Sequence, residues 1–575
     1  MIKNAHRTFT RSPWRRIFCS MFLVAAVVAL VAAVASSDAV GQRVGGNAVN
    51  IANKMAPWVI EHTAYGQQAE FFVVLADRAD LSPAANLPTK TEKGRFVYQT
   101  LREKAQRTQG PILEWLHERN IENQSFYIVN VILVKGTREI AAALAARPDV
   151  ARVEGNPHIQ NRLPQPETVE TSPPQPASGA RPATIELGIQ YTHAPDVWSL
   201  VFMGEGIVVA SADTGVRWTH NALKPHYRGW DGQNADHDYN WHDSIHDSVS
   251  NPCGNDSPEP CDDVAHGSHT TGTMIGDDGA GNQIGMAPAA KWIGCRNMDA
   301  GNGTPARYIE CMQWFLAPTR VGGGDPDPTK APDITNNSWE CPASEGCSFD
   351  TLQAAVEAQA AAGIMMVSAA QNSGPGCSTV QNPPGIYEAT YSAGALNTGT
   401  DTIASFSSRG PVTADGSNRI KPDISAPGTG TRSSTNASDS SYANFSGTSM
   451  ATPHIAGAIA LLWNAMPGLR HQLSDSRDAL NNSAVHISDD QCGDAGPPNN
   501  VYGWGRVDIL AAVGGSPSPT PTATATATTT PPPSPSPTPT DFPPPTPTPT
   551  TTPRPTPTPR GTPPSRPRPT PHPRP

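Results

Sequence analysis

The stretch FSGTSMATPHIAGAIALL, residues 445–462, joins a few small polar residues to a long apolar segment. Apolar side chains recur from Met450 at helical spacing, and Pro467-Gly468 ends the pattern. This periodicity predicts a buried helix of about four turns. Pro453 fits the first turn of such a helix, where no backbone donor is needed.

Ser449 lies at the start of this helix and has two interpretations. As a cap, its hydroxyl satisfies free N–H groups of the first turn. As a nucleophile, it gains from the positive end of the helix dipole and from N–H groups that point outward. The choice depends on whether the chain supplies partners for a nucleophile.

Three other polar residues lie at the ends of predicted strands or beside small residues, in the order Asp213, His266 and Asn372. Each of them alone is more often a turn or structural residue. Together with Ser449 they make a complete set, because a serine hydroxyl needs a histidine to take its proton and the imidazolium needs a carboxylate. An amide donor then stabilises the oxyanion.

The chain resembles the subtilisin-like serine proteases, the subtilases, from about residue 184 to residue 513. The resemblance rests on the motifs SADTGV, HGSHTTGT, AAQNSG, FSSRGP, KPDISAPG and GTSMATPHIAGA. It implies an α/β catalytic domain, residues 184–515, with a mostly parallel central sheet flanked by helices. The implied activity is that of a secreted serine endopeptidase that acts through an acyl-enzyme and is made as a self-processed zymogen.

Carried over to this sequence, the resemblance makes Asp213 the orienting acid, His266 the general base and Ser449 the nucleophile. Asn372 becomes the side-chain donor to the oxyanion. No cofactor is expected for this chemistry, and a structural Ca²⁺ is a family expectation without assigned ligands. Polypeptides are the expected substrates, and the enzyme is expected to act as a monomer.

The substrate cleft is expected to include Ser338, Trp339, Glu340, Ala370 and Gln371. This chain departs from the family there, because Gln371 stands where glycine is frequent and Trp339-Glu340-Cys341 follows NNS where glycine is usual. Glu340 has two interpretations that the sequence leaves open. It attracts a basic substrate side chain, or it faces solvent.

Residues 70–156 alternate strand and helix patterns and predict a small two-layer α+β unit. The expected strands are 70–76, 125–134 and 150–156, and the expected helices are 91–119 and 138–146. The unit resembles the subtilase inhibitory propeptide, which implies a ferredoxin-like fold and a propeptide over residues 36–160. Residues 161–183 predict an exposed linker, and processing is expected within 157–185.

The two ends of the chain have biased compositions. Residues 1–35 carry five basic residues and an apolar run from Ile17 to Ala35, which is typical of a secretory signal peptide. An uncleaved anchor is the alternative, because 19 apolar residues just span a bilayer. Residues 516–575 are rich in proline and threonine and predict an extended, disordered tail that is a candidate stalk at the cell envelope.

The net charge of −10 includes +5 from residues 1–35 and +4 from residues 516–575, so the chain between them carries −19. Such an acidic body argues against a nucleic-acid partner. Eight cysteines remain beyond Cys19, which suggests disulfides in an exported protein. Short separations favour Cys253–Cys261 and Cys341–Cys347, and free buried thiols are the alternative.

Two acidic or histidine-rich segments invite a metal interpretation. His237-Asp238, His242-Asp243 and His246-Asp247 occur in one insertion, for which a hydrophilic surface loop is the favoured interpretation. Asp277 and Asp278 offer oxygen ligands for Ca²⁺, but a turn without metal explains them equally well.

Two further classes of function share the predicted fold. A catalytically silent binding protein should have lost a member of the triad, and none is missing. A peptide ligase or cyclase uses the same acyl-enzyme, and product mass distinguishes it from a hydrolase because only hydrolysis adds water.

Overall fold

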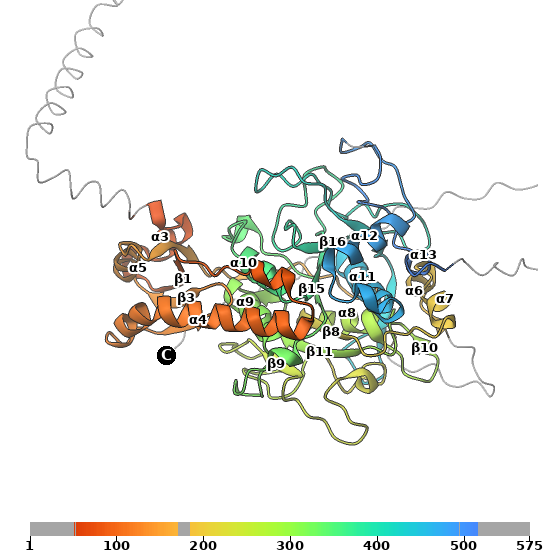
Figure 1. Cartoon of the computed structure of the whole chain (residues 1–575), viewed down its shortest axis with the longest axis horizontal. Coiled ribbons are helices and arrows are strands. Elements are labelled where there is room, and N and C mark those ends of the chain that lie inside the picture. The colour runs from red at the N-terminus through yellow and green to blue at the C-terminus, as the bar shows by residue number, and fades with distance from the viewer. Residues whose placement is uncertain (1–50, 52, 171–183, 494, 516–575) are drawn as a thin grey trace, which may run out of the picture. The chain divides into compact units, whose positions relative to one another are not determined.

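The computed structural model describes residue 51 and residues 53–170, 184–493 and 495–515 (Figure 1). The predicted signal peptide, residues 171–183 of the predicted linker and the Pro/Thr-rich tail lie outside the described residues. Within the described part, none of the helices combines the length and the apolar character needed to cross a membrane.

A seven-stranded sheet lies at the centre of the larger folded region. Its strand order is β17-β16-β15-β14-β8-β11-β9, and every neighbouring pair is parallel. The strands are β8 (Val208–Asp213), β9 (Trp241–Asp243), β11 (Lys291–Arg296), β14 (Ile334–Asn337), β15 (Met365–Ala369), β16 (Thr390–Leu396) and β17 (Ile424–Pro427). The predicted α/β class with a parallel sheet is therefore confirmed.

Helices cover both faces of this sheet. They are α8 (His266–Ile275), α9 (Pro305–Leu316), α10 (Gln353–Ala361), α11 (Thr448–Ala465) and α12 (Leu473–Ser483). Helix α11 packs on β14 to β17, and its Ile459 shares one core with Val367 of β15. The neighbouring Met366 points the other way, into a second core with Met312 of α9. Both faces are apolar because side chains alternate along a strand that is buried on both sides.

Helix α11 begins at Thr448, and its N-cap is Gly447, so Ser449 is not the cap residue. The expected buried helix is present. Pro453, however, lies inside the helix and not in its first turn. A proline has no N–H, so the carbonyl of Ser449 loses its usual helical donor, and the Ser338 hydroxyl donates to that carbonyl at 3.1 Å instead.

A second, four-stranded antiparallel sheet forms the unit expected at the N-terminal side. Its order is β2-β3-β1-β4, and the chain order β-α-β-β-α-β is that of a ferredoxin-like fold. The elements are β1 (Ala69–Leu75), α4 (Lys90–His117), β2 (Asn123–Phe126), β3 (Val131–Gly136), α5 (Arg138–Ala145) and β4 (Val150–Gly155).

The prediction of one strand over residues 125–134 is wrong, because the structure has the β2–β3 hairpin there. The chain reverses at Asn130, whose φ is +49°. Asn130 Nδ2 donates to the carbonyl of Asp77 at 2.8 Å, and its Oδ1 accepts from Gln109 Nε2 at 3.0 Å. Asparagine tolerates this left-handed conformation, and its side-chain bonds fix the turn.

This unit contacts the larger folded region through several polar bonds. Lys90 Nζ lies 2.7 Å from Asp333 Oδ1, in an ion pair whose two side chains are mostly buried. Gln313 Oε1 on α9 accepts from the backbone N–H groups of Tyr127 and Ile128 at 2.7 and 3.2 Å. The contacts lie on the β2–β3 hairpin and the start of α4, so both layers of the unit take part.

Shorter elements connect and flank these layers. They are α3 (Pro57–His62), α6 (Leu187–Tyr191), α7 (Ala194–Ser199), α13 (Ile509–Ala512), β5 (Ile159–Gln160), β6 (Thr168–Glu170), β7 (Thr184–Ile185), β10 (Asn282–Gln283), β12 (Met298–Asp299), β13 (Asn302–Gly303), β18 (Thr431–Ser434) and β19 (Tyr442–Phe445), with six 3-10 turns.

Among the described residues, four disulfides lie in the larger folded region. The predicted pairs Cys253–Cys261 and Cys341–Cys347 are confirmed. The other two join residues farther apart in sequence, Cys295 to Cys311 and Cys377 to Cys492. The first of these links β11 to α9, and the second ties the loop after β15 to the segment before residue 500.

Candidate active site

Asp213 and His266 form a buried pair at the carboxyl end of strand β8 of the central sheet. Asp213 ends β8, His266 begins α8, and both side chains are fully buried. His266 Nδ1 donates to Asp213 Oδ1 at 2.7 Å, and the N–H of Thr214 donates to the same oxygen at 2.7 Å. His266 Nε2 has no hydrogen-bond partner among the described residues. The pair therefore fixes the orientation of the imidazole ring and leaves Nε2 as the nitrogen that can accept a proton.

Asp262 fixes the segment that leads into His266. Its Oδ1 accepts from Thr214 Oγ1 at 2.8 Å and from the N–H groups of Val264 and Ala265 at 3.0 Å each. Its Oδ2 accepts from the N–H and the hydroxyl of Ser268 at 2.9 and 2.6 Å. One carboxylate thus joins the residue after Asp213 to the first turn of α8. The sequence interpretation missed it, although the doublet Asp262-Asp263 before His266 was a visible signal.

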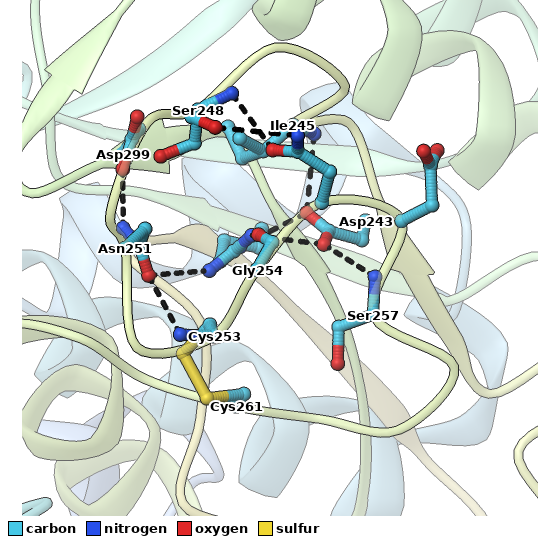
Figure 2. A network of polar contacts seen from close by, with 12 residues as sticks. Asp243, Ile245, Ser248, Asn251, Cys253, Gly254, Ser257, Cys261 and Asp299 are labelled. Carbon is cyan, nitrogen blue, oxygen red and sulfur yellow. Dashed lines mark hydrogen bonds and ion pairs between the residues drawn. A yellow bond between two sulfur atoms is a disulfide. The ribbon is translucent and has the colours of Figure 1, made fainter.

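A wider polar network lies around the Cys253–Cys261 disulfide, which directly precedes this segment in the chain (Figure 2). Arg296 at the end of β11 pairs with Asp243 of β9 through two contacts of 2.9 Å, and both side chains are buried. Asn251 Oδ1 accepts from Arg296 Nη1 at 3.3 Å, and its Nδ2 donates to the carboxylates of Asp263 and Asp299. The loop closed by the Cys253–Cys261 disulfide is thereby tied to two sheet strands.

Ser449 lies in the first turn of α11, which packs against α8, the helix that carries His266. Its hydroxyl donates to the carbonyl of Ser338 at 3.3 Å, while the hydroxyl of Ser338 donates to the carbonyl of Ser449 at 3.1 Å. Only 3% of Ser449 is exposed. In this conformation the Ser449 hydroxyl is hydrogen-bonded to the carbonyl of Ser338, the residue after β14, and not to His266.

Asn372 follows β15 and is tied to the start of α11. Its Oδ1 accepts from the N–H of Thr448 at 2.9 Å and from the Thr448 hydroxyl at 3.0 Å. An amide whose oxygen is occupied in this way presents its nitrogen as the donor. Asn372 therefore lies beside Ser449 with the chemistry needed to bind an oxyanion.

Four of the five predicted cleft residues line a small cavity beside Ser449, namely Ser338, Trp339, Glu340 and Gln371. Ala370 does not, because it is fully buried in the core between the sheet and α9, while Ala369 lines the cavity. Successive side chains at the end of a strand point to opposite faces of the sheet. A prediction that is wrong by one residue therefore assigns the side chain to the wrong face. Trp339 itself is fixed by stacking on Tyr308, with ring centres 3.9 Å apart.

The chain between the ferredoxin-like unit and the catalytic region runs past Ser449. Strand β5 pairs antiparallel with β13, and β6 pairs antiparallel with β19. Between them, Asn161 and Leu163 line the cavity beside Ser449. A Cβ placed on Gly447 would come within 2.7 Å of Pro164 Cγ, so Pro164 packs directly against the residue that caps α11. Residues 159–170 therefore lie along the site as an extended chain.

The residues considered for metal binding are used in other ways. Asp277 and Asp278 accept backbone N–H groups of their own turn at 2.8 Å, and Asp278 also binds the hydroxyl of Tyr442. One oxygen of Asp277 and both oxygens of Asp278 therefore accept hydrogen bonds from the protein. In the described ranges, no group of three or more His, Cys, Asp or Glu residues is arranged to hold a metal ion.

The histidine-rich insertion is likewise engaged by protein partners. Its histidines bind Tyr227 and Glu310, and its carboxylates pair with basic residues: His237–Tyr227, His242–Glu310, His246–Glu310, Asp238–Arg320, Asp243–Arg296 and Asp247–Arg307. The Glu310 carboxylate raises the pKa of His246 to about 9, so this pair is an ion pair at neutral pH.

A model of the subtilase family matches residues 204–505 of the chain. Bacillopeptidase F of Bacillus subtilis (strain 168) is 33% identical over 502 residues, which cover 81% of this chain and 33% of that protein. The chain thus spans about a third of the length of bacillopeptidase F.

Two further relatives align over a larger share of their own length. Serine protease AprX of Bacillus subtilis (strain 168) is 32% identical over 356 residues, covering 58% of this chain and 72% of AprX. Subtilisin E of the same organism is 26% identical over 331 residues, covering 57% of this chain and 71% of subtilisin E. The parallel sheet and the Asp213–His266 pair agree with these matches. The chain therefore belongs to the subtilase family of serine proteases.

Proposed function

We propose that the protein is an endopeptidase that hydrolyses polypeptides through Asp213, His266 and Ser449. The Ser449 oxygen attacks the substrate carbonyl while His266 Nε2 takes the hydroxyl proton, and Asp213 stabilises the imidazolium. The observation that carries this proposal is the buried 2.7 Å contact between His266 and Asp213, with Nε2 left unpaired among the described residues.

The oxyanion of the tetrahedral intermediate is stabilised by Asn372 Nδ2 and by N–H groups at the start of α11. As this intermediate collapses, the carbon–nitrogen bond breaks and His266 returns its proton to the leaving amine. Ser449 then holds the acyl group as an ester. A water molecule, deprotonated by His266, releases the acid and restores Ser449.

The chain's own residues 163–167 are the proposed first substrate. Two features support this proposal: the segment is flanked by strands β5 and β6, which pair with β13 and β19, and Pro164 packs against Gly447. We place the processing cut at a bond between Leu163 and Glu167. The released N-terminal unit, with its contacts to Asp333 and Gln313, remains as a temporary inhibitor.

We further propose that the enzyme is exported and acts as a monomer. The signal-like composition of residues 1–35 and the four disulfides support export. The Pro/Thr-rich residues 516–575 then serve as a stalk at the cell envelope.

Labelling with a fluorophosphonate tests the proposal. Residues 36–575 are expressed beside a Ser449→Ala control, and labelling, intact mass and peptide maps are recorded. The expected result is a label on Ser449 and release of a unit of roughly 15 kDa, both absent from the control. A folded protein that neither labels nor cleaves, with or without Ca²⁺ and added trypsin, would favour a silent binding protein.

A further inference from the structure

Helix α3 precedes the ferredoxin-like order and is fixed to its edge. The N–H of Ala56, the N-cap residue of α3, donates to the carbonyl of Val153 in β4 at 2.9 Å. Lys54 Nζ donates to the carbonyl of Val150 in the same strand at 2.6 Å, and Val59 is fully buried in the core of the unit. The helix therefore belongs to the N-terminal unit, although the β-α-β-β-α-β order begins only at β1.

The indole of Trp58 on α3 lies between two glycines from different parts of the molecule. A Cβ on Gly155, at the end of β4, would overlap the indole. On the other side is Gly346, in the loop of the larger folded region that the Cys341–Cys347 disulfide closes. A Cβ there would come within 2.6 Å of Trp58 Cδ1, and the φ of Gly346 is +107°, a conformation that favours glycine. The indole fits because neither glycine carries a side chain.

Two polar contacts reach the same segment of the larger folded region. The N–H of Gln160 donates to Glu345 Oε2 at 2.9 Å. Arg152 Nη2 lies 3.0 Å from Asp350 Oδ2, and the two side chains are 30% and 27% exposed. An ion pair that is partly open to water adds little energy. The indole of Trp58 is therefore the main anchor of the N-terminal unit on residues 345–350.

This 345–350 surface is separate from the other contacts of the N-terminal unit. Those contacts join Lys90 to Asp333 and the β2–β3 hairpin to Gln313. The described residues 345–350 also do not line the cavity beside Ser449. Tryptophan and arginine are among the residues that most often carry the energy of a protein–protein contact. The surface can thus strengthen binding of the unit without taking part in the chemistry.

We propose that the 345–350 surface is a second binding site for the N-terminal unit, which accepts an aromatic side chain and is occupied by Trp58. Through it the larger folded region selects its own N-terminal unit and retains it after the chain has been cut. Arg152 orients the partner, since charge pairs contribute more to specificity than to affinity. The inference rests on the proposed self-processing and adds the contact that sets the lifetime of the inhibited state.

Dissociation of the cut complex tests this proposal. Residues 36–575 and the variants Trp58→Ala and Gly346→Ala are allowed to process themselves. Intact mass records the cut, and fluorophosphonate labelling counts the active Ser449. The complex is then diluted, and the rate at which peptide hydrolysis appears gives the dissociation rate of the unit. We expect both variants to be cut as completely as the natural chain and to release the unit about 10- to 100-fold faster.

Two matched variants separate the contact from the folding of the unit. Trp58→Phe keeps a flat ring between the glycines and should restore part of the slow release. Trp115 packs on the unit's own core, with the guanidinium of Arg119 4.4 Å from its ring centre. Trp115→Ala therefore measures how far a looser core alone speeds release, and Trp58→Ala should exceed it about tenfold.

Combined variants show whether Trp58 and Gly346 act through one contact. The double variant Trp58→Ala/Gly346→Ala should release the unit no faster than the faster of the two single variants. Trp58→Ala combined with Lys90→Met should instead multiply the two effects, because Lys90 contacts Asp333 at a different place.

Failure of the inference differs from failure of the proposed function. Release at the natural rate in either Trp58→Ala or Gly346→Ala would overturn the inference and leave the protease function intact. Effects of these two changes that multiply, or a Trp115→Ala variant as fast as Trp58→Ala, would overturn it too. A natural chain that neither labels at Ser449 nor cuts itself would remove the proposed function, and the inference with it.

Discussion

At the scale of single residues, Asn372 is the clearest test of the proposed chemistry. Its oxygen is held by Thr448, so substitution by alanine removes the amide donor without touching Ser449 or His266. For Asn372→Ala we expect kcat to fall about 10²- to 10³-fold, the range known for the corresponding loss in subtilisin, with little change in KM. Steady-state kinetics on one peptide check this, with Asn482→Ala, at an exposed position of α12, as the control. A matching rise in KM would indicate a substrate-binding role instead.

Replacing the buried carboxyl of Asp263 is predicted to increase the stability of the folded protein in a pH-dependent way. Burial raises its pKa to about 6 from 3.8, opposed by the Ala300 N–H and the Asn251 side chain, and its buried Oδ1 has no partner in the described part of the chain. The unfolded chain therefore loses this proton first. The raised pKa disfavours the folded state only weakly at pH 4 and increasingly as pH rises from about 4 to about 6.

Asp263→Asn should accordingly raise the free energy of unfolding by about 1 to 3 kcal/mol at pH 8 and by much less at pH 4. Urea denaturation of the Ser449→Ala protein at both pH values measures the effect without self-digestion. An equal gain at the two pH values would show that charge burial is not the cause.

Individual site residues could be predicted where a sequence motif specifies both the residue type and its place at a strand end or a helix start. Asp213, His266, Asn372 and Ser449 lie where strand ends and a helix start were expected. Gln371 could be recognised only as a departure from glycine, because its positive φ and its bonds to residues ten positions later depend on how distant loops meet. Ala370 was misplaced by one residue, which reverses the face of a strand.

At the scale of elements, the ion pair between Lys90 and Asp333 joins the start of α4 to the loop before β14. The exposed fractions of the two side chains are 17% and 3%, so the pair is largely removed from water. Asp333 keeps Arg470 and the N–H of Val208 as partners when Lys90 is removed, which limits the loss.

For Lys90→Met we expect the released N-terminal unit to inhibit the processed enzyme about 10- to 100-fold more weakly. Inhibition constants of the purified units measure this. Lys104→Met is the matched control, because Lys104 pairs with Asp77 inside the same unit at 2.5 Å. Equal weakening by both variants would point to a folding defect.

Elements with strong local patterns followed the sequence closely. Helix α11 and the ferredoxin-like order came from apolar periodicity and strand–helix alternation. The β2–β3 hairpin did not, because residues 125–134 read as one apolar run while the turn at Asn130 depends on Gln109 of a different element. The position of Pro453 inside α11 was not predicted for the same reason. The hydroxyl of Ser338, the residue after β14, replaces the hydrogen bond that Pro453 cannot donate.

At the scale of the whole molecule, the Cys377–Cys492 disulfide joins residues 115 positions apart, whereas Cys253–Cys261 closes a separation of 8. A longer closed loop removes more conformational entropy from the unfolded chain. Replacing both Cys377 and Cys492 by serine should therefore cost about 2 kcal/mol more than the same change at Cys253 and Cys261.

Thermal and urea unfolding of the two double variants, both in the Ser449→Ala background, compares the two costs. A larger loss from the short loop would mean that native contacts around Cys253, and not chain entropy, dominate. The sequence suggested the short pairs from spacing alone, while the long link required knowledge of which loops lie together.

The pairing of β6 with β19 bears on the reversibility of self-cleavage. The proposed cut between Leu163 and Glu167 leaves the new carboxyl end a few residues after β5, which pairs with β13, and the new amine close before β6, which pairs with β19. Leu163 lines the cavity beside Ser449. An amine held there has a high effective concentration and can attack the acyl-enzyme in place of water, which re-forms the bond. In the described structure, three residue pairs hold β6 on β19. Strand β5, in contrast, is continuous in the chain with the whole N-terminal unit. Under the proposed self-cleavage, we therefore expect departure of β6 to be the step that makes the opening of the peptide bond permanent.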